Sequence, residues 1–221
     1  MKTDDNVGEG NTDSYFASAY GTWTGEAGYL EGTLTAGLHQ YQDERSIDIG
    51  TIHRTATSKH KGQTVSTGLG TGTILPAGNW QVQPRASLLY TYLYQPGFNE
   101  TGADSLNMQV ATRETHSLKS ELGVQIARVF HLGENLLIPE VSAAWEHDFD
   151  VDDRKITTSF EGLPGSTFTV EQTDVPTESQ RLHAGLILVH KKRFQTALSY
   201  DASFHKNYTA QGLSGEVRIS F

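Results

Sequence analysis

Histidine and carboxylate side chains are the residues of this chain that could ligate a metal or exchange protons. The sequence holds 9 His and 26 Asp and Glu residues. The histidines lie in separate segments and no HExxH pair is present, so their spacing indicates no zinc site. Four aspartates gather at Asp148, Asp150, Asp152 and Asp153, without the glycine and distal glutamate of an EF-hand calcium loop. We therefore expect no metal site and interpret this stretch as a solvated acidic loop.

Nucleophilic catalysis and phosphate binding have equally little support. No G-x-S-x-G elbow is present to expose a catalytic serine. Gly68–Gly72 resembles a phosphate-binding loop, but no helical pattern follows it to supply backbone amides, and glycines that ease the curvature of a strand are the simpler interpretation. The chain has no Cys, which excludes disulfides and thiolate ligands. The sequence thus predicts no catalytic residue, no cofactor site and no enzymatic activity.

Charge and apolar content narrow the class of protein further. The net charge of −9 argues against a nucleic-acid partner, and no basic cluster offsets it. Only 36% of the residues are hydrophobic, below the ~45–50% of ordinary globular domains, which disfavours a large dry core. No run of ~18 apolar residues exists, so a transmembrane helix is excluded while membrane strands are not. Strands with apolar side chains on one face only would fit this composition.

The last nine residues, 213–221, show the pattern of such a strand. They alternate strictly and end at an aromatic residue without a turn or tail. The apolar face holds Leu213, Gly215, Val217, Ile219 and Phe221, and the polar face holds Ser214, Glu216, Arg218 and Ser220. A strand that is apolar outside, charged inside and closed by a terminal Phe is typical of a barrel wall facing lipid.

The rest of the chain repeats strand and turn, with no helical period of useful length. The expected strands cover 14–24, 29–41, 61–75, 80–94, 118–126, 137–149, 180–189, 194–205 and 213–221. Short turns at 25–28, 76–79, 131–135 and 190–193 alternate with long connections at 42–60, 95–112 and 150–178. Outer-membrane barrels distribute their periplasmic turns and extracellular loops in this way. The aromatic residues near the strand ends suit the headgroup region of a bilayer.

Several of these segments resemble the translocator β-domain of autotransporters, the type V secretion proteins. The resemblance is distributed over the chain from about residue 14 to its end. The segments that show it are 29–41, 122–130, 138–149, 198–204 and 213–221, together with the loop at 160–170. The resemblance implies an antiparallel, up-and-down transmembrane β-barrel of twelve strands, of which about nine are visible here. We accordingly expect a polar N-terminal segment at 1–13 and a barrel domain at 14–221 that lacks its first strands, so that the chain would be a fragment.

The same resemblance implies a location and a set of partners. The protein would lie in the bacterial outer membrane, anchoring and exporting a passenger segment, with membrane lipid and the barrel-assembly machinery as its other partners. Val217, Ile219 and Phe221 would form the signal that this machinery reads. Inward-facing charges would line the hydrated pore, and these are Glu31, Arg85, Lys119, Glu121, Glu140, Glu146, Asp201, Glu216 and Arg218.

Two other hypotheses remain open at this point. A closed barrel of eight to ten strands could act as a surface-binding protein through its long loops, and strand number would distinguish it. A soluble β-sandwich or lipocalin-like module would instead turn its apolar faces inward and stay soluble without detergent. The two membrane hypotheses place the apolar faces outward, so the direction of those faces separates them from the soluble one.

Overall fold

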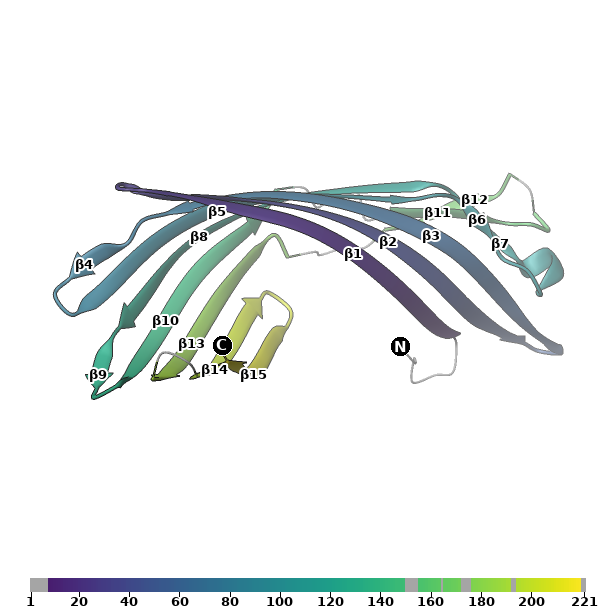
Figure 1. Cartoon of the computed structure of the whole chain (residues 1–221). Helices are drawn as coiled ribbons and strands as arrows, with labels where there is room; N and C mark the ends of the chain where they lie inside the picture. Colours follow the sequence, from purple (N-terminus) through teal and green to yellow (C-terminus); the bar gives the residue numbers. More distant parts are fainter. Residues whose placement is uncertain (1–7, 150–154, 164, 172–175, 192–193, 220–221) are drawn as a thin grey trace.

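Residues of alternating polarity form strands along most of the chain. The computed structural model describes residues 8–149, 155–163, 165–171, 176–191 and 194–219. Within these residues, nine long antiparallel strands pair in the order β1-β2-β3-β5-β8-β10-β13-β14-β15 and curve into an arch (Figure 1). Each long strand pairs with the next one along the chain, which confirms the predicted all-β, up-and-down architecture.

The long strands differ in length, and β2 and β3 are the longest. They are β1 (Gly8–Gly25), β2 (Gly28–Ile49), β3 (Ile52–Gly72), β5 (Trp80–Gln95), β8 (Arg113–Arg128), β10 (Asn135–Asp148), β13 (Glu178–His190), β14 (Phe194–His205) and β15 (Thr209–Ile219). Two short strands, β4 (Leu75–Ala77) and β9 (Phe130–Leu132), pair with β5 and β10. No helix in the described part of the chain is long and apolar enough to span a membrane.

The strand register places the apolar residues of neighbouring strands on one continuous face. Ala36 lies opposite Ala17 on β1 and Val65 on β3, and Val65 in turn lies opposite Tyr92 on β5. This face is open: the side chains of Leu34 and Leu198 are 54% and 53% exposed. Apolar side chains therefore point away from the protein, as the membrane hypothesis predicts and contrary to a soluble sandwich.

The opposite face carries the polar residues and is the more crowded one. Glu121 and Glu146 lie opposite each other on β8 and β10, with side chains only 16% and 21% exposed. A curved sheet crowds the side chains on its concave side and separates those on its convex side. We call the crowded polar face the inner face and the apolar one the outer face.

Two inner-face glycines admit aromatic rings from the adjacent strand. A Cβ atom at Gly72 would lie 2.6 Å from the Tyr29 hydroxyl, which accepts a hydrogen bond from the Gln83 amide at 3.0 Å. A Cβ atom at Gly37 would lie 2.7 Å from the ring of Phe16. Close side-chain approach, in addition to curvature, therefore accounts for glycine in these strands.

Three features of the fold were not predicted. The connection expected at 42–60 is a continuation of β2 and β3 to the tight turn at residues 50 and 51, and β1 begins at Gly8 inside the segment expected to be a polar lead. The loops expected at 95–112 and 150–178 build a second sheet in the order β12-β11-β7-β6. Its strands are β6 (Phe98–Asn99), β7 (Met108–Val110), β11 (Lys155–Phe160) and β12 (Thr167–Glu171).

The large sheet does not close on itself within the described residues. β1 and β15 stand at the two ends of the strand order, and no pairing joins them there. An unpaired backbone group in hydrocarbon costs several kcal/mol, so both edges require a partner strand in the membrane. The described strands alone therefore do not form the small closed barrel that the surface-binding alternative requires.

The outer face predicts an asymmetric response to charge. We expect Leu34→Arg, on the outer face of β2, to lower the free energy of unfolding by about 2–4 kcal/mol, because it places a cation in hydrocarbon. The matched variant Thr35→Arg turns its side chain to the inner face and should change it by less than about 1 kcal/mol. Urea unfolding in lipid vesicles measures both, and equal losses would contradict the assignment of the faces.

Candidate functional site

All nine residues predicted to line a pore lie on the inner face of the sheet. The register joins them through inner-face positions, as in the row Glu31, Gly70, Ser87, Glu121 and Glu146 across β2, β3, β5, β8 and β10. The same face holds Arg85, Lys119, Glu140, Asp201, Glu216 and Arg218. One surface of the sheet therefore gathers the charges that the sequence distributes over six strands.

The centre of the inner face is a chain of ion pairs. Arg85 Nε lies 3.2 Å from one carboxylate oxygen of Glu121, and Arg181 Nη1 lies 3.1 Å from the other. Arg181 also pairs with Glu146, which accepts a hydrogen bond from the Ser179 hydroxyl at 2.8 Å. Arg181 thus holds two carboxylates from adjacent strands that would otherwise repel each other.

A second group of contacts centres on His183. Its two ring nitrogens lie 2.8 Å from the Asp201 carboxylate and 3.4 Å from that of Glu140. Glu140 also accepts a hydrogen bond from the Gln125 amide at 2.8 Å. This group links β8, β10, β13 and β14. Together with the Arg85–Glu121 pair, the inner-face polar contacts run across five strands, from β5 to β14.

The structure does not bring every predicted residue into these two groups. Glu216 and Arg218 pair with each other on β15 at 2.9 Å. Glu31 is exposed, and its carboxylate lies over the Cα of Gly70. The predicted inner face therefore has a paired centre on β5–β14 and an open flank toward β1.

Arg181 and His183 were not among the predicted inner-face residues, because the second half of β13 carries apolar side chains on both faces. The two residues are spaced by two and share the inner face, which is the signal that could have identified them. Their neighbours Leu182 and Leu186 occupy the outer face of the same strand. Long apolar side chains nearby obscured an alternation that is present.

Away from residues 42–60 of β2 and β3 and from Arg113 at the start of β8, carboxylates outnumber cations on the inner face. The acidic residues are Glu31, Glu121, Glu140, Glu146, Asp148, Asp201 and Glu216, and the cations are Arg85, Lys119, Arg181 and Arg218. The local potential is therefore negative, and this face favours cationic groups that pass along it. Among the described residues, no group of three or more His, Asp or Glu side chains could hold a metal ion.

The terminal strand places its apolar residues on the outer face. Val217 lies opposite Thr196 and Ile219 lies opposite Phe194, and both apolar side chains are exposed. Phe221, the third residue predicted to form the assembly signal, lies outside the described residues. The described part of the strand thus presents an exposed apolar row along its free edge.

The two long loops join each other beyond the end of the sheet. β7 of the first loop pairs with β11 of the second, with Val110 opposite Thr158 and Met108 opposite Phe160. The Asn107 side chain donates a hydrogen bond to the Glu161 carboxylate at 2.9 Å. We call the second sheet and the residues that connect its strands the loop unit. It comprises residues 98–110, 155–163 and 165–171.

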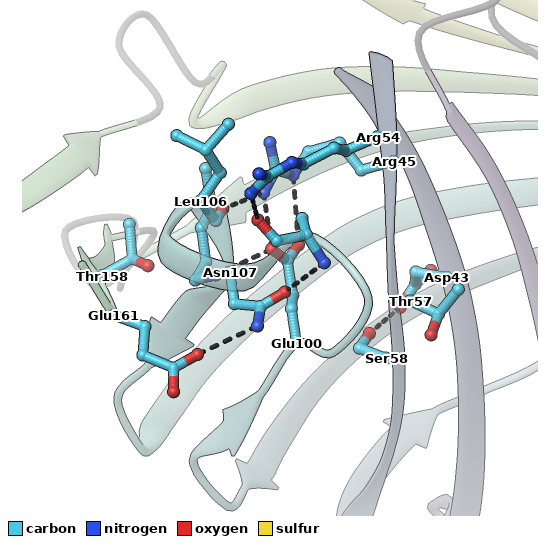
Figure 2. Close-up of polar contacts among 12 residues, drawn as sticks. Asp43, Arg45, Arg54, Thr57, Ser58, Glu100, Leu106, Asn107, Thr158 and Glu161 are labelled. Atoms are coloured by element: carbon cyan, nitrogen blue, oxygen red, sulfur yellow. Dashed lines mark hydrogen bonds and ion pairs between the residues drawn. The ribbon is translucent and has the colours of Figure 1, made fainter. Parts of the chain in front are cut away.

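The loop unit is docked on the inner face of the β2–β3 hairpin, and Figure 2 shows the contacts. The Arg45 guanidinium donates two hydrogen bonds to the Glu100 carboxylate, at 3.1 and 2.6 Å, and a third to the Leu106 carbonyl at 3.0 Å. Glu100 is held from its other side by the Met108 amide at 2.8 Å, and its side chain is only 12% exposed. A bidentate arginine–carboxylate pair of this kind is among the stronger polar contacts in proteins.

Further contacts surround this pair. Arg54 donates a hydrogen bond to the Ala103 carbonyl at 2.8 Å. Ile47 and Ala56 from the hairpin pack with Ala103 and Leu106 from the loop unit into a small apolar cluster. Backbone bonds of 2.8 and 2.9 Å also join residues 57 and 101. The docked position is therefore specified by hydrogen bonds, charge and packing together.

A cavity of about 610 Å³ lies between the hairpin and the loop unit. On its wall the His60 ring is stacked between Tyr41 and Phe98, with ring centroids 4.7 and 3.9 Å away. The His60 side chain is only 10% exposed, and the nearest carboxylate oxygen, on Asp43, is 3.6 Å from Nδ1. Burial lowers the pKa of His60 below its ordinary value, against the opposing effect of Asp43.

This pKa shift predicts that docking of the loop unit depends on pH. A histidine whose pKa is lowered on docking stabilises the docked state above its ordinary pKa of about 6.5, and that contribution is lost as the pH falls through the lowered value. We expect amide hydrogen exchange at 98–110 to accelerate between pH 7.5 and 5, after correction for intrinsic rates. His60→Phe keeps the ring stack and should flatten this dependence, whereas His53→Phe, on the exposed hairpin tip, should not. An unchanged dependence in His60→Phe would contradict the assignment.

Solved structures of low sequence identity share this fold. The β domain of the Bordetella autotransporter BrkA matches 96% of this chain and 75% of its own, with a TM-score of 0.64 and 17% identity. The translocator domain of the autotransporter NalP from Neisseria meningitidis matches 98% of this chain and 68% of its own, with a TM-score of 0.67 and 20% identity. At these identities the likeness shows the fold.

Curated proteins match at the sequence level over much of this chain but over little of their own. Outer membrane protein A of Rickettsia rickettsii is 26% identical over 174 residues, which are 76% of this chain and 8% of that protein. Esterase EstA of Pseudomonas aeruginosa is 26% identical over 162 residues, which are 72% of this chain and 25% of that protein. The chain therefore spans a quarter or less of these two relatives.

The model of the autotransporter β-domain family matches residues 1–201. The curved sheet, its apolar outer face and its charged inner face are what such a domain needs in order to cross an outer membrane by strands. The family resemblance found in the sequence is thereby confirmed, and with it the location in the bacterial outer membrane. The chain belongs to the autotransporter β-domain family and is an outer-membrane translocator domain.

Proposed function

We propose that the inner face lines the hydrated path along which an exported passenger segment crosses the outer membrane. The observation that supports this proposal is the single charged face, which all nine predicted pore residues share. Polar side chains need water on that side of the sheet, and an extended polypeptide needs a hydrated route through the bilayer. The chain would act by lining and anchoring this route, without catalysis.

The outer face and the terminal strand have the two other proposed roles. Exposed leucines such as Leu34 and Leu198 would contact membrane lipid. Val217 and Ile219, with Phe221, would form the strand that the barrel-assembly machinery recognises. Exposed apolar side chains beside a free strand edge are suited to such a contact, because they offer both packing and backbone pairing. We also propose that the barrel domain expected at 14–221 includes the start of β1 at Gly8, because residues 8–13 pair with β2.

The negative potential of the inner face predicts a charge preference in export. The experiment attaches an epitope-tagged segment ahead of Met1, in a lysine-rich and a glutamate-rich version, and measures the tag on intact cells. We expect the basic segment to appear severalfold faster. The double variant Glu140→Gln and Asp201→Asn should reduce the ratio of the basic to the acidic export rate. Gln40→Glu on the outer face should leave this ratio unchanged. Equal export of both segments by the unmodified chain would contradict the proposed pore lining.

The terminal residue provides a test of assembly. Deleting Phe221 should lower the amount of protein inserted in the outer membrane severalfold, because the last apolar side chain of the recognised strand is lost. Fractionation followed by a heat-modifiability gel measures insertion. Ser220→Ala removes the polar side chain next to Phe221 in the sequence and should leave insertion unchanged. Normal insertion of the deletion variant would count against the assembly role.

A further inference from the structure

The two loops of the loop unit are bonded to each other and therefore move together. Its two parts come from different connections, one between β5 and β8 and the other between β10 and β13. Besides the β7–β11 pairing, the Glu161 and Gly162 amides donate hydrogen bonds to the Asn107 and Ser105 carbonyls, at 2.9 and 3.0 Å. Two loops joined along their backbones cannot open separately without breaking these bonds.

The contacts that hold the loop unit to the hairpin are of another kind. Most of them are polar and include the Arg45–Glu100 pair, the Arg54–Ala103 bond and an ion pair of 3.1 Å between Arg54 and Asp104. The stack of Phe98 on His60 adds an aromatic contact. The apolar cluster beneath them contains one isoleucine, two alanines and a partly buried leucine. Water can replace polar contacts when a surface opens, so this attachment is far easier to release than a large apolar core.

The docked position lies on the path that export would use. Ile47 and Ala56, against which the loop unit packs, are on the inner face of β2 and β3, the face that also carries Glu31 and Glu121. The hairpin extends past the outer-face apolar belt, where Lys59 and Lys61 replace leucine and valine. The loop unit therefore lies against the inner side of the sheet and the edge of β3. This end carries the long connections, which in outer-membrane barrels is the extracellular end.

We infer that Arg45 and Glu100 form a latch that holds the loop unit across the mouth of the export path, and that the latch must release for a segment to pass. This inference rests on the proposed export function. Arg45 and Glu100 are positioning residues here: they act by fixing the loop unit. Docking closes the mouth, and undocking, which breaks the three Arg45 hydrogen bonds together, opens it.

The bridge between residues 57 and 101 permits a reversible lock. The two threonines pair by reciprocal backbone hydrogen bonds and their hydroxyl oxygens lie 3.3 Å apart. Such pairs have Cα atoms ~5.5 Å apart, within the range of a disulfide. The chain has no Cys, so the double variant Thr57→Cys and Thr101→Cys introduces its only thiols.

Oxidation of this double variant should block surface appearance of the tagged segment at least tenfold, and a reducing agent should restore it. The matched control is Ser18→Cys with Thr35→Cys, a pair on β1 and β2 whose hydroxyl oxygens lie 2.9 Å apart, away from the loop unit. This control should export equally in both redox states. Undiminished export by the oxidised lock would overturn the latch.

A second measurement reports on docking without export. A thiol introduced by Leu106→Cys, in the apolar cluster, should react severalfold faster with a membrane-impermeant maleimide when Arg45→Ala is added, and Arg45→Lys should give an intermediate rate. An unchanged labelling rate in Arg45→Ala would overturn the latch. Failure of the unmodified chain to export any segment would instead count against the proposed function, and the labelling rates would still decide whether the latch exists.

Discussion

Backbone hydrogen bonding in a medium without water is the constraint on which the rest of this structure depends. Strands that cross hydrocarbon must have their backbone groups paired. In the described sheet each long strand between β1 and β15 pairs with a neighbour on both sides. Pairing fixes the register, and because side chains alternate along a strand, the register fixes which face meets lipid and which meets water. The outer apolar belt and the inner charges both result from this register. The free edges of β1 and β15 still need a partner strand.

The sequence was most informative where lipid acts on one face of a strand. Around Leu34 and Leu198 the alternation of polarity is clean, and the predicted strands and faces agree with the register. Between 42 and 60 the hairpin has water on its outer side, so polar residues occupy both faces and the period of two disappears, although the strands continue. The alternation of polarity therefore marks where such a strand leaves the membrane. The strand itself continues beyond that point.

Contacts between distant segments could not be predicted from local patterns. The pairing of Met108–Val110 with Lys155–Phe160 joins two loops that are both rich in polar residues, and neither segment alone indicates its partner. The same holds for Arg45 and Glu100, which are separated by 55 residues. The nine predicted inner-face charges were accessible from alternation alone, whereas the role of Arg181 in joining Glu121 and Glu146 required the register of three strands.

The central claim is that opposite faces of one sheet meet lipid and water. Because the chain has no Cys, a spin label can be attached to single cysteines placed one at a time at residues 30–38 of β2. The accessibility of each label to oxygen, which dissolves in lipid, is then compared with its accessibility to a water-soluble nickel chelate. We expect a period of two, with oxygen favoured at 30, 34, 36 and 38 and nickel favoured at 31, 33 and 35. Equal accessibility along the strand, or the opposite phase, would contradict it.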